Sequence, residues 1–277
     1  MTSVDLLSEI EKLLSKWWLI SHQHERHLAE LDEFKATTED SEVKNRAWAC
    51  TTALQAHLLY LEIFGLLKTE DFYRAWCQLE RLEILLSELR NNQNQINGDL
   101  GQSYLLNAVN TWQTLYPYKL FTSSRQIIKK MSCSICKTPR SVLKGCRHRK
   151  GKLYAGEICY DEVNDFEFIT FDIVSNPVMK SAVLRGPEAD HYDYSLLKAA
   201  LMIATTPRDC FTAWKIDIPL AKHTGVNSPT STCPCMRSIR NYEDCCMSRP
   251  TVETNHIIFD VFSPRRVALR ALDDKQV

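Results

Sequence analysis

Apolar residues recur at the spacing of an α-helix from the start of the chain to residue 115. The first such helix face is formed by Leu7, Ile10, Leu14, Trp17, His24, Leu28 and Leu31, which follow the three-and-four spacing of one side of a helix. Further helices are predicted over residues 42–67, 71–90 and 103–115, and the polar run 91–102 predicts a loop. Because short loops connect these segments, we expect an antiparallel helical bundle over residues 1–120.

After Pro117 the helical period fades and β-rich fragments alternate with turns and cysteines. The aromatic and β-branched run 166–174 predicts a strand, with residues 179–184 as its hairpin partner. A short helix is expected over residues 194–204, a strand over 213–218 and a last strand that starts at His256. The fold class indicated is therefore α+β, with helices first and strands later.

Composition places the chain among ordinary globular proteins, since it has 277 residues, of which 44% are apolar and 25% charged. The formal net charge of zero indicates neither a nucleic-acid partner nor a basic one, so any argument from charge must be local. The first residues, MTSVDLLSEIEKLL, carry acids where a signal peptide needs basic residues. The most apolar window, residues 58–67, is too short to span a bilayer. We therefore expect a cytoplasmic protein without membrane insertion.

Eleven cysteines in a cytoplasmic chain indicate metal ligands rather than disulfides, because thiols are kept reduced there. The first cluster has the form C-x2-C-x9-C-x-H-x10-C, and two cysteines separated by two residues can aim both sulfurs at one ion. Zinc takes four such ligands in a structural site. Five candidates compete for the four positions: Cys133, Cys136, Cys146, His148 and Cys159.

The second cluster has the form C-x-C-x9-C-C and offers four thiolates within fourteen residues. These candidate zinc ligands are Cys233, Cys235, Cys245 and Cys246. A closed tetrahedral site matches this number of donors, so the sequence predicts two zinc ions per chain.

The second cluster resembles the SEC-C motif, a metal-binding tail first recognised in the SecA translocation ATPase. The matching residues are Cys233-Pro234-Cys235, Tyr242 and Cys245-Cys246. The chain departs from the motif where Met236-Arg237-Ser238 replaces a Gly-Ser-Gly turn and where Glu243 and Asp244 replace lysines, and it has one extra residue before the final pair. Segments over residues 117–263 are also similar to bacterial SEC-C-domain proteins. The resemblance implies two zinc sites and a cytoplasmic location, and it implies no established reaction.

A basic stretch around the first cluster supports a nucleic-acid-binding alternative, since cations near phosphates release counterions. The candidate residues are Arg140, Lys144, Arg147, Arg149, Lys150 and Lys152. The same cations can instead offset the negative charge of a zinc thiolate site, and acids follow directly from Glu157 to Glu167.

A catalytic role has little support in the sequence, which contains no P-loop, dinucleotide fingerprint, G-x-S-x-G or H-E-x-x-H motif. Glu157 could act as a base beside a zinc-bound water if the first cluster had only three protein ligands, which would make the protein a zinc-dependent hydrolase. The residues His22, His24 and His27 are interpreted as helix surface or partly buried core rather than a metal site, and Cys50, Cys77 and Cys210 as core thiols.

The sequence therefore predicts three parts. These are a helical bundle over residues 1–120, a zinc-knuckle or treble-clef-like α+β domain over 121–228, and a SEC-C-like zinc module with a terminal strand over 229–277. The predicted function is that of a two-zinc protein-interaction or scaffold module without catalysis, with a protein as its partner.

Overall fold

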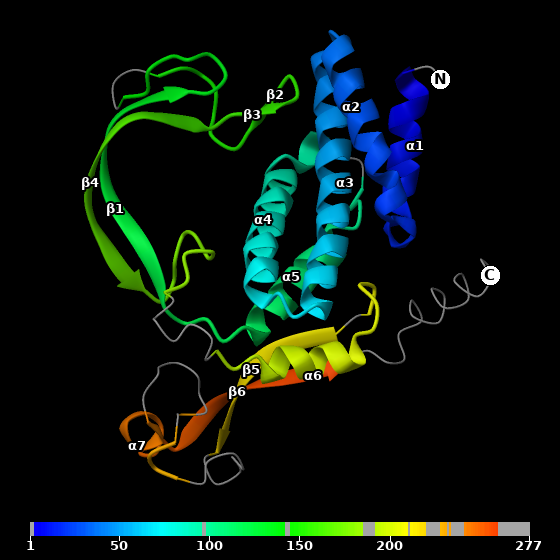
Figure 1. The fold of residues 1–277 in the computed structure, drawn as a ribbon. Coiled ribbons are helices and arrows are strands. Elements are labelled where there is room, and N and C mark those ends of the chain that lie inside the picture. Colours follow the sequence, from blue (N-terminus) through cyan, green and yellow to red (C-terminus); the bar gives the residue numbers. More distant parts are fainter. Residues whose placement is uncertain are drawn as a thin grey trace, which may run out of the picture. The chain divides into compact units, whose positions relative to one another are not determined.

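The chain combines seven α-helices with small two-stranded sheets among its described residues, so the predicted mixture of helix and sheet is confirmed (Figure 1). The computed structural model describes residues 3–95, 98–141, 145–184, 192–209, 211–219, 228–231, 233 and 241–259. Two compact units divide the chain, Met1–Leu106 with Ser124–Asp172 and Asn107–Ser123 with Ile173–Val277. The first unit therefore contains both the long helices and the first cysteine cluster.

The long helices of the first unit follow the predicted ranges closely after residue 40. They are α1 (Ser3–Ser15), α2 (Arg26–Thr37), α3 (Ser41–Lys68) and α4 (Phe72–Asn91). Asp40 begins α3 by accepting hydrogen bonds from the backbone N–H groups of Glu42 and Val43, at 2.8 and 3.2 Å. The predicted apolar face of α4 is buried, with Leu79, Leu82 and Leu86 fully inaccessible.

The first predicted helix is interrupted, which the apolar period did not indicate. Short 3-10 turns at Trp17–Leu19 and His22–Glu25 separate α1 from α2. At Ser21 the side chain and backbone form a capping box with His24, whose ring Nδ1 lies 3.1 Å from the Ser21 backbone nitrogen. A serine that hydrogen-bonds to nearby residues competes with the hydrogen bonding of a continuous helix, so α1 ends before Ser21 and α2 begins after it.

The core of the first unit is built around α3, which contacts α1, α2 and α4. By length and composition alone α3 could cross a membrane, with a mean hydropathy of 1.3 in its most apolar window. Within the structure, however, 72% of that window is buried, and a buried core helix can have the same length and hydropathy as a membrane-spanning helix. Among its side chains Leu54, Ile63 and Leu67 are fully inaccessible to solvent.

The strands pair differently from the sequence prediction. β4 (Asp161–Val174) pairs with β1 (Phe121–Cys133), a strand that the sequence analysis did not predict. The expected hairpin partner of β4, residues 179–184, instead returns to the start of β1. Its Val183 forms a single bridge with Phe121, and Ala182 O accepts a hydrogen bond of 2.7 Å from Thr122 N. The apolar run of β4 was recognised correctly, but its partner lies far away in sequence.

The remaining elements are short. α5 (Gln102–Leu115) begins in the first unit and continues into the second, and β2 (Leu153–Tyr154) pairs antiparallel with β3 (Glu157–Ile158). In the second unit, α6 (Ser195–Ile203) and β5 (Phe211–Pro219) lie at their predicted places. β6 (Thr251–Phe259) begins five residues before the predicted start at His256 and pairs antiparallel with β5. Trp112 packs edge-on against Phe211, with ring centroids 4.8 Å apart.

The loop before α5 is fixed by a buried histidine. His57 Nε2 lies 2.8 Å from Leu100 O, and the His57 ring stacks on Trp17 at 6.0 Å between centroids. Gly101 follows with φ +77, and a Cβ there would lie 2.6 Å from His57 Cε1 and 2.8 Å from Trp17 Cγ. Only glycine satisfies both the left-handed backbone and the close ring contact. Burial lowers the pKa of His57 to about 4.

We predict that Gly101→Ala lowers the free energy of unfolding by about 3 kcal/mol, because strained backbone and overpacking act together. The matched control is Gly65→Ala in α3, where a Cβ meets nothing within 4 Å. Alanine is the better helix former, so the control should stabilise the chain by about 1 kcal/mol. Denaturant unfolding followed by circular dichroism measures both variants, and equal effects of the two substitutions would contradict the account.

The buried His57 should also make stability depend on pH. Above pH 6.5 the imidazole is neutral in both states, whereas below it the unfolded chain takes up a proton that the folded chain refuses down to about pH 4. We predict a loss of about 3 kcal/mol between pH 7 and pH 4 that is absent from His57→Gln. Urea unfolding of both proteins across this range is the measurement, and parallel pH profiles would show that His57 titrates normally.

Candidate metal centre

The first cysteine pair lies on a tight turn at the end of β1. Lys137 N donates to Cys133 O at 2.8 Å, and Cys133 N donates to Thr138 O at 3.0 Å. Lys137 adopts a left-handed φ of 58, which turns the chain back directly after Cys136. The turn thus holds both cysteines at one end of the ribbon formed by β1 and β4, which is the arrangement predicted from the C-x2-C spacing.

The second pair of donors reaches the same point from the loop before β2. Donor atoms of Cys133, Cys136, Cys146 and His148 all lie within 4.8 Å of one another. Cys133 Sγ lies 3.7 Å from His148 Nδ1, and the His148 ring packs edge-on against Tyr154 at 4.6 Å between centroids. The structure therefore brings together four of the five candidates of the first cluster.

The two thiols of the turn are prepared for deprotonation by their surroundings. Burial acts to raise the pKa of Cys133, but hydrogen bonds from the backbone N–H groups of Cys136 and Ile135, together with neighbouring thiols, lower it to about 7. Hydrogen bonding to the side chain and backbone of Thr138 lowers the pKa of Cys136 to about 7 as well. A metal ion binds the thiolate, so these bonds favour the ligand form.

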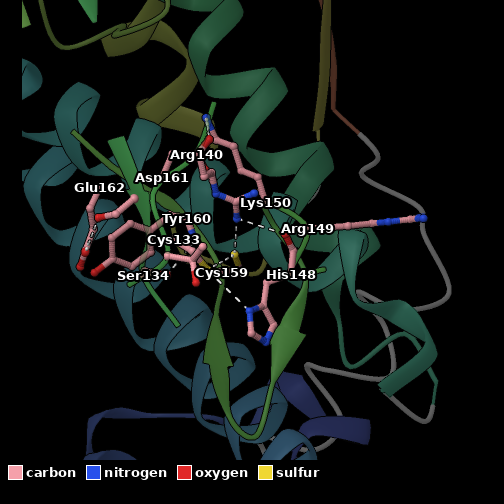
Figure 2. A network of polar contacts seen from close by, with 12 residues as sticks. Cys133, Ser134, Arg140, His148, Arg149, Lys150, Cys159, Tyr160, Asp161 and Glu162 are labelled. Atoms are coloured by element: carbon pink, nitrogen blue, oxygen red, sulfur yellow. Dashed lines mark hydrogen bonds and ion pairs between the residues drawn. The ribbon is translucent and has the colours of Figure 1, made fainter. Parts of the chain in front are cut away.

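The fifth candidate, Cys159, is fully buried and lies next to Cys133, outside the group of four donors. Its Sγ is 3.7 Å from Cys133 Sγ and 3.2 Å from Arg140 Nη2, which also donates to His148 O at 3.1 Å (Figure 2). Arg140 Nε and Asp161 Oδ1 form an ion pair at 2.7 Å. Both atoms are buried, and neither has a further hydrogen-bond partner among the described residues. Burial and the neighbouring Cys133 raise the pKa of Cys159.

Two buried asparagines connect this loop to the helices. Asn45 Oδ1 of α3 accepts a hydrogen bond from Gly156 N at 2.8 Å. At the end of α4, Asn92 Oδ1 accepts from Leu153 N at 3.0 Å, and Asn92 Nδ2 donates to Gly151 O at 2.9 Å. These side chains hold the β2–β3 hairpin beside α3 and so fix the segment between His148 and Cys159 (Figure 1). No spacing or motif in the sequence indicated either asparagine.

The donor geometry fits a tetrahedral metal ion. With zinc–sulfur bonds of about 2.3 Å, two sulfurs at tetrahedral corners lie about 3.8 Å apart, and a sulfur and a nitrogen about 3.5 Å apart. Within the group of four, Cys133 Sγ lies 3.7 Å from His148 Nδ1 and all donor atoms lie within 4.8 Å of one another, while the sulfur 3.7 Å from Cys133 Sγ is that of Cys159. Thiolate and imidazole donors suit zinc among the common divalent metals.

The donors of the second cluster that lie within the described residues are also close together. Donor atoms of Cys233, Cys245 and Cys246 lie within 4.8 Å of one another, and the last two sulfurs are 3.8 Å apart. Cys245 ends the short helix α7 (Tyr242–Cys245), which Ser231 O anchors by accepting from Tyr242 N at 2.9 Å. Cys235, the fourth predicted donor, lies outside the described residues. Both predicted clusters can therefore hold a metal ion.

The basic stretch is largely engaged within the protein. Lys137 pairs with Glu162 at 2.6 Å, and Lys152 Nζ donates to Asn91 O at 2.6 Å. Of the six nucleic-acid candidates, Arg140, Lys150 and Lys152 contact acids or a carbonyl, Lys144 lies outside the described residues, and Arg147, Arg149, Lys150 and Lys152 are exposed. Arg140 donates to Cys159 Sγ at 3.2 Å, which fits the other interpretation of these cations, that they offset the charge of thiolates.

The other candidates are spread over the molecule. His22 and His27 bond Glu25 and Glu30 at 3.0 and 2.7 Å, and His24 bonds Ser21. Cys50 is buried, which raises its pKa to about 12, Cys77 is half-buried in α4, and Cys210 lies outside the described residues. Glu157, the candidate hydrolase base, lines a cavity of about 630 Å³ beside the turn, together with Trp48, Glu88, Ser134, Lys137, Ile158 and Tyr160.

Comparison with known proteins adds no family to this description. Searches of protein-family models, curated proteins and solved structures each find no match to the chain. The metal centre is therefore understood from its own donors and geometry.

Proposed function

We propose that the chain binds two structural zinc ions and acts as a protein-interaction or scaffold module in the cytoplasm. The convergence of Cys133, Cys136, Cys146 and His148 within 4.8 Å is the observation that carries zinc binding. Four protein donors close the coordination of zinc, whereas a catalytic zinc keeps a position for water. This donor count supports a role without catalysis and weighs against the zinc-hydrolase alternative.

The second ion would be bound by Cys233, Cys245 and Cys246, with Cys235 completing a SEC-C-like site. Around this cluster the buried apolar contacts are few among the described residues, with Tyr242 packing against the cysteines themselves. Metal binding would therefore supply the folding free energy that a core supplies elsewhere, on the order of 10 kcal/mol for small zinc motifs.

An exposed apolar ribbon supports the interaction role. Within the first unit, the strands β1 and β4 leave large side chains in solvent: Ile127, Val163, Phe166, Phe168, Ile169 and Phe171. Phe171 is 68% exposed and Phe166 is 53% exposed. Ion pairs within the ribbon, such as Lys129 with Glu167 at 2.9 Å, already neutralise its charges. Exposed apolar surface on this scale marks interaction sites in soluble proteins.

The nucleic-acid alternative keeps Arg147, Arg149, Lys150 and Lys152 as its exposed cations. Affinity purification with and without nuclease separates the two proposals. Co-purifying proteins that survive nuclease support the interaction role, and proteins that disappear with nuclease support the alternative.

The first prediction from this proposal concerns metal content. Protein purified without added metal should hold two zinc ions per chain by elemental analysis. Cys133→Ser removes one donor of the first cluster and should lower the zinc content to one ion per chain. The same change in α4, Cys77→Ser, should leave the zinc content at two ions per chain. Less than one equivalent in the unmodified chain, or equal loss in both variants, would falsify metal binding at the first cluster.

The second prediction concerns the ribbon. Phe166→Ser should weaken binding of the co-purifying protein by about 2 kcal/mol, as truncation of an interface aromatic does. The matched control is Ile84→Ser in α4, which is also 53% exposed. Titration of the isolated partner against each variant gives the dissociation constants. If the two serines weaken binding equally, or neither does, the ribbon is not the interface.

A further inference from the structure

The first metal centre has one donor more than zinc requires. Cys133 Sγ lies 3.7 Å from Cys159 Sγ and equally 3.7 Å from His148 Nδ1. Both separations match an edge of a tetrahedral site, which is about 3.8 Å for two sulfurs and about 3.5 Å for sulfur and nitrogen. His148 belongs to the group of four whose donor atoms all lie within 4.8 Å of one another, whereas Cys159 has the separation of a tetrahedral edge from Cys133 alone.

The position of Cys159 is built into the hairpin. Cys159 N donates to Lys152 O at 2.9 Å, and Cys159 O accepts from Gly151 N at 2.7 Å. These bonds hold the cysteine at the base of the β2–β3 hairpin, which Asn45 and Asn92 connect to the helices. The sulfur is thus held next to the centre by fixed backbone.

A single guanidinium contacts the sulfur of Cys159 and the backbone of His148. Arg140 Nη2 lies 3.2 Å from Cys159 Sγ and 3.1 Å from His148 O, and Asp161 holds the other side of the group at 2.7 Å (Figure 2). A thiolate that accepts a hydrogen bond from Arg140 donates less electron density to a metal ion, which makes Cys159 the weaker of the two donors. The same cation offsets the extra negative charge that a fourth thiolate would bring.

We propose that Cys159 is an exchangeable fourth ligand, which the centre can take in place of His148, and that Arg140 controls the exchange. The inference rests on the proposed metal binding at the first cluster. Exchange would break the bond to the His148 imidazole, form one to the Cys159 sulfur and release the Cys159 thiol proton to the freed imidazole or to water, so that the donors change from three thiolates and one imidazole to four thiolates. Cys159 already lies 3.7 Å from Cys133, and its sulfur would have to move toward Cys136 and Cys146.

Cadmium-113 NMR of the intact chain tests this directly, because cadmium takes the same donors and its resonance moves to higher frequency when sulfur replaces nitrogen. The wild-type chain should show a first-cluster resonance of three sulfurs and one nitrogen, assigned by its loss in Cys133→Ser. His148→Ala should keep the resonance and shift it to the four-sulfur region. Cys159→Ser should leave the wild-type resonance in place.

Zinc affinities measured by chelator competition give a second readout. Each single variant should weaken first-cluster binding by about tenfold at most, whereas the double variant His148→Ala with Cys159→Ser should weaken it by about a hundredfold or more. Loss of the resonance in His148→Ala, or in Cys159→Ser, would overturn the exchange, since one fixed donor would then be required. A wild-type chain without any first-cluster resonance would instead overturn the proposed metal binding itself.

Arg140→Lys provides a variant that retains all five donors and the positive charge. Lysine has one nitrogen in place of the guanidinium, whose Nη2 contacts Cys159 and His148 O while its Nε meets Asp161. The first-cluster resonance should move toward the four-sulfur region in this variant, with unchanged circular dichroism. An unmoved resonance would show that Arg140 does not control the choice of ligand.

Discussion

The hydrogen bonds of Asn45 and Asn92 are the constraint on which the candidate metal centre depends. Asn45 lies on α3 and Asn92 directly follows α4, and each is nearly inaccessible to solvent and bonds the backbone of the β2–β3 hairpin. A buried amide left without partners would cost about 1–3 kcal/mol, so the hairpin and the helices stabilise each other. Because the hairpin separates His148 from Cys159, its docking on α3 and α4 determines where both donors lie. The helical scaffold thereby prepares the donors for a metal ion.

Charge around the centre is organised at short range, as a net charge of zero for the whole chain requires. Basic residues that follow β1 meet acids of β4 directly, with Lys137 beside Glu162 and Arg140 beside Asp161. Surface pairs of this kind contribute little to stability, but they remove free cations from the surface. The partly buried Arg140 differs from the others, since it contacts the sulfur of Cys159. The basic stretch thus belongs in part to the metal centre.

Features that depend on local periodicity could be predicted from the sequence, whereas features that depend on contacts between distant segments could not. The ranges of α3 and α4 and the burial of Leu79, Leu82 and Leu86 followed from apolar spacing. The break at Ser21 and the pairing of β4 with β1 did not, because a capping serine and a distant partner leave the period unchanged. Cysteine spacing located both clusters but could not rank His148 against Cys159. Where these two residues lie depends on contacts with Arg140, Asn45 and Asn92, of which the sequence marked only Arg140, as part of the basic stretch.

Anomalous diffraction at the zinc absorption edge is the most direct test of the central claim, which is that the fold itself gathers these donors around one ion. Crystals of protein purified without added metal should show a peak about 2.3 Å from the sulfurs of Cys133, Cys136 and Cys146, with Arg140 and Asp161 beside it. A peak elsewhere in the first unit, or electron density for a disulfide between these cysteines without any peak, would contradict the account.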